Sequence, residues 1–84
     1  MKDSAGARPV LTVYSRPGCH LCEVLVERLL PLARGRAEVD VVNIDSRDEW
    51  RERYGLRVPV VAFDGEDLCQ YELDEPAIRR VLGL

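Results

Sequence analysis

The sequence predicts an α/β domain in which a four-stranded mixed sheet carries helices on both faces, with the element order β-α-β-α-β-β-α. Two observations predict this class. In the first half, β-branched runs flank a segment of helical period, which is typical of a βαβ unit with parallel strands and a right-handed crossover. In the second half, Asp64-Gly65 separates two further runs, which is typical of a type I′ hairpin. Joining the two halves gives a mixed sheet.

The first half of the chain contains two predicted strands and one helix. Residues 10–14 form a β-branched and aromatic run between turn residues, which predicts a buried strand. From Cys19 onward leucines recur at helical spacing, and Pro31 is expected to kink or end that helix near Leu30. Residues 37–44 alternate apolar and acidic side chains, which predicts a strand with one more solvent-exposed face.

The second half contains a short helix, the hairpin strands and a final helix. The segment Ser46–Glu49 fits a capping box, and a short helix from there to Tyr54 follows. Residues 58–63 and 66–71 are predicted to be the strands of the hairpin. Asp74 is predicted to cap the last helix, which has a proline in its first turn.

Length and composition indicate one domain and narrow the possible partners. The 84 residues suffice for a single domain over 9–84, preceded by a flexible tail over 1–8. The net charge is −3, and acids interleave with arginines between 47 and 57, which argues against a nucleic-acid partner. No apolar run is long enough to span a bilayer, and the first residues lack the apolar core of a secretory signal. We therefore expect a soluble, cytoplasmic monomer without membrane or nucleic-acid partners.

Two of the three cysteines, Cys19 and Cys22, have a Cys-x-x-Cys spacing at the predicted start of a helix. Unpaired backbone N–H groups and the helix dipole favour a thiolate at this position. Residues three apart share a helix face, so Cys22 lies within reach of Cys19. This predicts an exposed nucleophile and a covered resolving thiol that form a redox-active disulfide.

The residues around Cys19 fit the same chemistry. Arg16 precedes it by three residues in the connecting turn, where its cation can stabilise the thiolate. His20 adds a titratable group that either favours the thiolate or faces solvent. Pro17 and Gly18 are expected to hold the turn open and to let a partner backbone approach.

Pro59 lies at the start of a strand that the element order places centrally in the sheet, where proline is uncommon. A cis Val58–Pro59 bond would explain its tolerance there. Such a segment, facing the cysteine pair, would present free backbone groups to an extended substrate chain.

These residues resemble glutaredoxins. Residues 14–22, Tyr-Ser-Arg-Pro-Gly-Cys-His-Leu-Cys, are similar to the active-site segment of that family, and Val58-Pro59 matches its Val-Pro, in which the proline is cis and lies against the site. The order of elements over 9–84 resembles the thioredoxin fold in its short glutaredoxin version. The resemblance implies a thiol–disulfide oxidoreductase in cell redox homeostasis, with Cys19 as nucleophile and Cys22 as resolving thiol.

The chain departs from the glutaredoxin pattern at two places. His20-Leu21 stands where Pro-Tyr is usual, and Cys69-Gln70 stands where the family has a Gly-Gly that allows glutathione to approach. Glutathione is thus a possible electron donor with an atypical binding loop, and no bound cofactor is expected. The predicted partners are a disulfide-containing protein or a glutathione-like substrate.

Two other functions compete with the oxidoreductase. The cysteines could hold an iron–sulfur cluster in a carrier module, or the disulfide could be a staple in a thioredoxin-fold interaction domain without turnover. A zinc site needs four ligands, and besides the pair only Cys69 and His20 are available, so no metal site is expected. Cys69 itself is expected to be a small apolar residue of the fourth strand.

Overall fold

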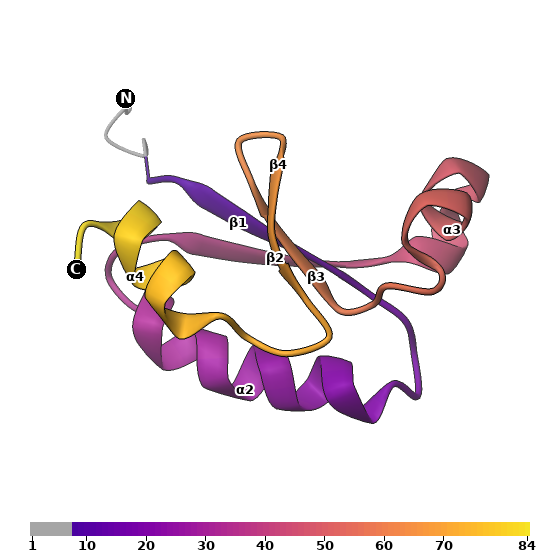
Figure 1. Cartoon of the computed structure of the whole chain (residues 1–84), viewed down its shortest axis with the longest axis horizontal. Helices are drawn as coiled ribbons and strands as arrows, with labels where there is room; N and C mark the ends of the chain where they lie inside the picture. Colours follow the sequence, from indigo (N-terminus) through magenta and orange to yellow (C-terminus); the bar gives the residue numbers. More distant parts are fainter. Residues whose placement is uncertain (1–7) are drawn as a thin grey trace.

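The computed structural model describes residues 8–84 and shows a four-stranded mixed sheet with helices packed against it (Figure 1). The strand order is β2-β1-β3-β4. The elements follow in the predicted sequence, with one additional 3₁₀ turn: β1 (Val10–Ser15), α2 (His20–Ala33), β2 (Glu38–Asn43), η1 (Ile44–Ser46), α3 (Asp48–Tyr54), β3 (Val60–Phe63), β4 (Glu66–Gln70) and α4 (Glu75–Leu82). The α/β class and the element order predicted from the sequence are confirmed.

Strand pairing brings three segments to one edge of the sheet. β1 pairs parallel with β2, so Ser15 lies opposite Asn43. β1 pairs antiparallel with β3, so Tyr14 lies opposite Val60. The loop after β1, the turn after β2 and the segment leading into β3 therefore meet at the carboxyl end of β1. The cysteine pair lies in the first of these segments, at the start of α2.

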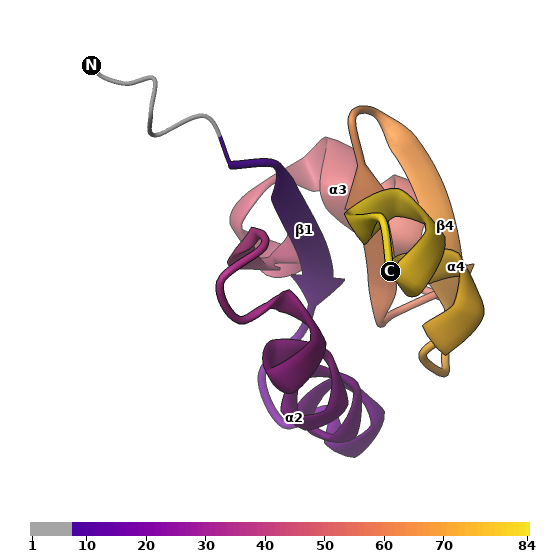
Figure 2. The same cartoon turned by 90° about the vertical axis from the view of Figure 1, so that its left-hand side faces the viewer.

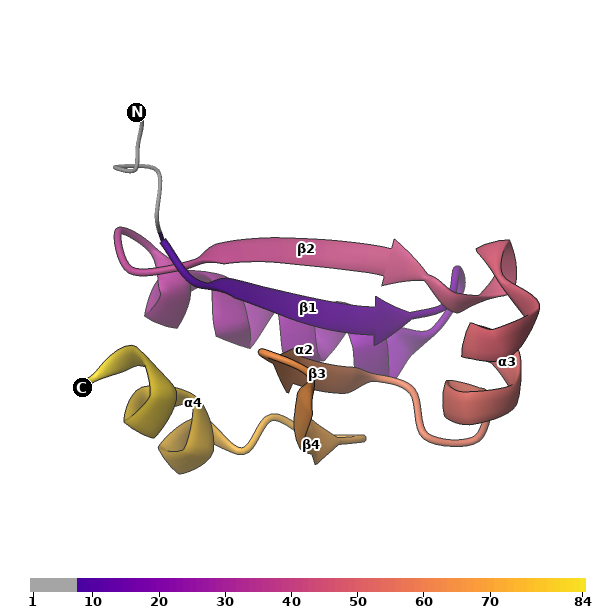
Figure 3. The same ribbon diagram turned by 90° about the horizontal axis from the view of Figure 1, so that it is seen from above.

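One face of the sheet is covered by α2 and α4, which lie beside each other beneath the strands (Figures 1 and 3). Their apolar stripes and the inward side chains of β1 and β3 form the larger core. Its fully buried members include Leu11, Val13, Leu29, Val61 and Ile78. This core fixes α2, and hence its N-terminus, against the sheet.

The opposite face is covered at one end by α3, which lies beyond the ends of β1 and β2 (Figures 2 and 3). Because successive strand residues point to opposite faces, Tyr14 and Val60 pack here rather than in the larger core. The ring of Tyr14 stacks on Tyr54 at 4.0 Å and meets Trp50 edge-on at 5.7 Å. The aromatic residues of α3 are therefore packing residues. Burial, together with the neighbouring Tyr14, raises the pKa of Tyr54.

Pro31 does not end α2 near Leu30. The helix continues to Ala33, and the backbone N–H of Arg34 still donates to Leu30 at 3.0 Å. Proline removes one helical hydrogen bond. Leu29 and Ala33 are buried on the same face of the helix, and this tertiary packing outweighs the local loss.

The prediction of a capping box over Ser46–Glu49 is also wrong. The hydroxyl of Ser46 donates to the carbonyl of Asn43 at 2.7 Å and thereby closes η1. Helix α3 begins after Arg47, which makes no side-chain cap. The serine is used by the 3₁₀ turn that the sequence pattern did not reveal.

The strand limits differ slightly from the predicted ones. Of the predicted strand over 37–44, only Glu38–Asn43 form β2, because Ile44 is the first residue of η1. β3 begins two residues after Val58, and β4 ends before Tyr71, whose φ of 69° lies in the left-handed region. Asp74 caps α4 as predicted, because its carboxylate accepts from the Ala77 N–H at 3.1 Å.

The expected tail over 1–8 lies outside the described residues apart from Arg8, which is exposed. Within residues 8–84, every helix is too short or too polar to cross a bilayer.

Candidate active site: the Cys19–Cys22 pair

Cys19 is the N-cap residue of α2. Its backbone is extended, with φ −90° and ψ 107°, and its Sγ accepts the backbone N–H of Cys22 at 3.2 Å. The backbone N–H of Cys19 in turn donates to the Arg16 carbonyl, at 3.2 Å, which closes the connecting turn. The sulfur of Cys19 thus takes the place of the capping oxygen at a helix start. A hydrogen bond and the positive end of the helix dipole both favour the thiolate over the thiol there.

The two cysteines differ in exposure. Cys19 is half-buried, whereas Cys22 is only 4% exposed and lies one turn into the helix. Their Cα atoms are 5.3 Å apart, and the sulfurs form a disulfide bond. The geometry therefore has one sulfur that a partner can reach and a second, covered sulfur positioned behind it.

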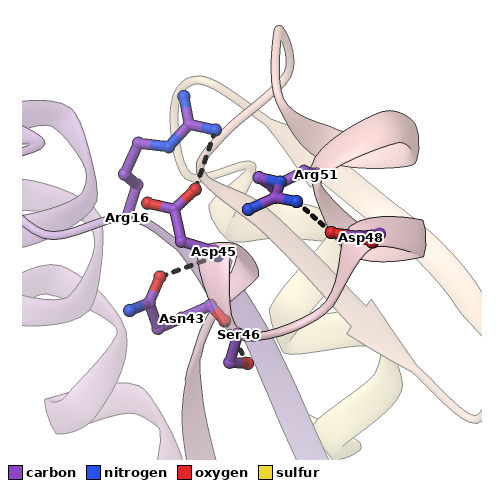
Figure 4. Close-up of polar contacts among 6 residues, drawn as sticks. All are labelled: Arg16, Asn43, Asp45, Ser46, Asp48 and Arg51. Atoms are coloured by element: carbon purple, nitrogen blue, oxygen red, sulfur yellow. Dashed lines mark hydrogen bonds and ion pairs between the residues drawn. The ribbon is translucent and has the colours of Figure 1, made fainter.

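The Arg16 guanidinium is directed toward η1, as Figure 4 shows. Its Nη2 lies 3.3 Å from the Asp45 carboxylate. Gly55, at the end of α3, has no side chain, and a β-carbon added to it would lie 3.8 Å from Nη2 of Arg16. The Arg16 guanidinium therefore also lies close to the end of α3. Arg16 thus belongs to the loop of the cysteines, while its charge is shared with Asp45.

The other residues predicted around Cys19 line its loop. The His20 side chain is 84% exposed, and its Nδ1 is 4.0 Å from the carboxylate of Glu23. Pro17 and Gly18 form the exposed tip of the loop, and Gly18 has a φ of 78° that other residues rarely adopt. This backbone requirement explains the glycine before the first cysteine.

Val58 and Pro59 approach the same edge of the sheet from the β3 side. The peptide bond between them is cis, and Pro59 is fully buried. The Pro59 carbonyl accepts the Tyr71 N–H at 2.8 Å. Within residues 8–84, Val58 makes no backbone hydrogen bond, and it is only partly buried.

The segment that replaces the Gly-Gly of glutaredoxins lies on β4. Cys69 is half-buried opposite Val61, and burial raises the pKa of its thiol. The Gln70 side chain is engaged, because its amide oxygen accepts from Arg57 at 2.9 Å. Arg57 also pairs with Asp67 at 2.8 Å. Cys69 and Gln70 are therefore integrated into the sheet.

Sequence reasoning missed the groove beside the cysteines and the partner of Arg16. An open groove of about 520 Å³ runs between α2 and the end of β2, and both cysteines line it. Asp45, which pairs with Arg16, was not considered from the sequence. Within the part of the chain that the structure describes, no group of three or more histidine, cysteine or acidic residues is arranged to hold a metal ion.

The fold and the cysteine pair define this molecule as a thioredoxin-fold protein with a Cys-x-x-Cys motif at a helix N-terminus. Its fold resembles that of the germline-specific thioredoxin Deadhead from Drosophila melanogaster, with a TM-score of 0.54 and 22% identity over 95% of this chain and 83% of that one. The model of the family described as "Glutaredoxin-like domain (DUF836)" matches residues 10–83. The chain belongs to this glutaredoxin-like family, as the resemblance of its motifs implied.

Other similar proteins carry no functional name. A protein from Nitrosomonas europaea, Ne2328, superimposes with a TM-score of 0.80 and 34% identity, over 96% of this chain and 98% of that one. The protein XcR50 from X. campestris has a TM-score of 0.67 and 38% identity, over 87% and 95%. An uncharacterized protein of Mycobacterium tuberculosis is 30% identical over 79 residues, which is 87% of this chain and 81% of the relative. These similarities support the fold.

Proposed function

We propose that the chain is a thiol–disulfide oxidoreductase that reduces disulfides with the Cys19–Cys22 dithiol. One observation carries the proposal: a half-buried sulfur caps a helix and accepts an N–H, while its partner sulfur is buried one turn further on. This arrangement favours a reactive thiolate at Cys19 and protects Cys22 until a mixed disulfide has formed. Membership of the glutaredoxin-like family gives independent support.

The reaction conserves electrons and atoms in two exchange steps. The Cys19 thiolate attacks one sulfur of the substrate disulfide, that S–S bond breaks, and the leaving thiolate takes a proton from water. The Cys22 thiol then loses its proton to water and attacks the Cys19 sulfur, which forms the protein disulfide and displaces the second half of the substrate as a thiolate that takes up a proton. Two electrons have passed from the dithiol to the substrate. An external thiol, glutathione or a protein dithiol, must return them in the same way.

The surrounding residues have supporting roles in this proposal. Arg16, whose charge is shared with Asp45, and the exposed His20 add positive charge near the Cys19 thiolate, and the tip formed by Pro17 and Gly18 lets a substrate backbone approach. On the β3 side, the free N–H and C=O of Val58 beside Pro59 pair with an extended substrate segment, as in strand addition. We favour a disulfide in a partner protein as the substrate, because the residues that replace Gly-Gly are occupied within β4.

Single cysteine variants test the proposal. Cys19→Ser is expected to abolish reduction of bis(2-hydroxyethyl) disulfide, because the attacking sulfur is absent. Cys22→Ser should still attack but should accumulate a mixed disulfide, visible as a mass adduct on Cys19. Cys69→Ser is the matched control, since that thiol lies on β4, and it should retain turnover. Full activity of Cys19→Ser would overturn the proposed function.

A further inference from the structure

A groove lies beside the cysteine pair on the β2 side. It has a volume of about 520 Å³, in the range of small-ligand sites. Since β1 separates β2 from β3 in the sheet, the groove and the Val58–Pro59 segment flank the cysteine loop on opposite sides. The side chains that matter here are Cys19, Cys22, Glu23, Val26, Glu27 and Val41. A molecule that fills this groove therefore lies beside the redox pair.

The α2 wall of the groove is acidic. Glu23 and Glu27 are four residues apart, so they lie on the same face of the helix. The Glu23 side chain is 70% exposed, and its carboxylate lies 4.0 Å from Nδ1 of His20. Glu27 forms no ion pair with any of residues 8–84. Arg16 also lines the groove, but its charge is compensated by Asp45 at 3.3 Å. The groove thus presents two carboxylates next to the cysteines that pair with no arginine or lysine of residues 8–84.

The groove also has an apolar surface. Val26 of α2 is half-buried, and Val41 of the edge strand β2 is 49% exposed. About half of the Val41 side chain is therefore accessible to solvent, and this apolar surface lies in the same groove as the two carboxylates. Long basic side chains suit such a surface, because their aliphatic stems lie on apolar groups while their charged ends reach acids.

We propose that this groove binds one half of the disulfide substrate, and that its occupant is an extended partner-protein segment with basic and aliphatic residues beside the cysteine. The inference rests on the proposed function and adds the substrate class. A disulfide has two halves, and the cysteine loop has two flanking surfaces. Val58 offers backbone groups to one half, and the groove offers Glu23, Glu27 and Val41 to the other.

The test compares peptide disulfides that differ only in charge. The probes are symmetric disulfides of three blocked pentapeptides with a central cysteine between two valines, flanked by two lysines, two serines or two glutamates. Reduced protein is mixed with each peptide at fixed pH and low salt, quenched with acid and separated chromatographically. Each rate is divided by that of dithiothreitol with the same peptide, which removes differences in intrinsic reactivity.

We expect the lysine peptide to react about three- to tenfold faster than the glutamate peptide, because two exposed carboxylates act together. Raising the salt to about 0.5 M should reduce this ratio, since the charges are solvent-exposed. The double variant Glu23→Gln/Glu27→Gln should bring the ratio below about twofold. The matched control Glu49→Gln/Glu52→Gln removes the same charge from α3 and should keep the ratio.

The outcomes separate this inference from the proposed function. Reaction with all three peptides at equal normalised rates would overturn the basic substrate class and leave the oxidoreductase intact. A lysine preference that survives in Glu23→Gln/Glu27→Gln, or that the α3 control also removes, would overturn the groove as its source. Failure to reduce any peptide or bis(2-hydroxyethyl) disulfide would overturn the proposed function itself.

Discussion

The ion pair between Arg16 and Asp45 is expected to limit how strongly Arg16 acts on the active-site thiolate. Nη2 of Arg16 lies 3.3 Å from Oδ1 of Asp45. The two side chains are 38% and 41% exposed, respectively. Asp45→Asn removes the competing carboxylate while it keeps the shape of the side chain. The Arg16 cation is then free to interact with the Cys19 thiolate, and the midpoint of the pH profile for alkylation of Cys19 should fall.

The structure limits the size of this effect. An ion pair that is more than one third exposed is worth about 0.2–1 kcal/mol. Since 1.36 kcal/mol corresponds to one pH unit, the midpoint should fall by no more than about 0.7. A more acidic thiol is also less nucleophilic, with a Brønsted coefficient of about 0.4–0.5. The alkylation rate below the midpoint should therefore rise by no more than about two- to threefold.

The assay is the rate of iodoacetamide alkylation of reduced protein against pH, in a Cys69→Ser background so that only the active-site pair reacts. Asp48→Asn is the control, because it removes the same charge from the neighbouring ion pair with Arg51 (Figure 4). Repeating Asp45→Asn in an Arg16→Gln background should give a smaller fall. An equal fall in both backgrounds, or with Asp48→Asn, would refute the reasoning.

Three further predictions concern stability. In the oxidised protein, burial raises the pKa of Cys69 above its ordinary value of 9.0, so its stabilising contribution is complete below pH 9 and is lost as pH rises through the folded-state pKa. As the pH is raised above 9, urea unfolding should then show a smaller loss of stability in Cys69→Ala than in the unchanged protein, and an equal loss would contradict this. Leu29→Ala, at a fully buried core position, should lower the free energy of unfolding by about 2–5 kcal/mol, and a change below about 1 kcal/mol would disprove its core role. Asp74→Ala removes the α4 cap on the Ala77 N–H and should cost about 0.5–2 kcal/mol by the same measurement, whereas Asp74→Asn should cost less.

Local patterns were sufficient for most of the fold. The leucine period of α2 matches a stripe with Leu25 and Leu29 buried against the sheet. Asp64 and Gly65 have φ values of 52° and 82°, as the predicted type I′ turn requires. These features depend on residues close in the sequence. Pro31 is different, because whether a helix continues through a proline depends on tertiary packing, here at Leu29 and Ala33.

The site was less accessible to sequence reasoning than the fold. The cysteine spacing and the turn before it are local, and they indicated the position of the redox pair. Arg16 and Asp45 are 29 residues apart, and only the parallel pairing of β1 with β2 brings them together. The alternation over residues 37–44 predicts that Val41 lies on the apolar face of its strand, yet it is 49% exposed because β2 is an edge strand beside the groove. Contacts of this kind depend on register and strand order, which local periodicity does not encode.

The most direct test of the dithiol mechanism is a redox titration of the intact protein. Samples are equilibrated in buffers with graded ratios of reduced to oxidised glutathione, alkylated, and measured by intact and peptide mass. The account predicts that Cys19 and Cys22 gain and lose their disulfide together as a reversible two-electron pair near the cytosolic poise, while Cys69 stays a free thiol. If the reduction potential of the pair lies below about −300 mV, the pair is a structural disulfide that the glutathione buffers do not reduce. That result would contradict the proposed activity.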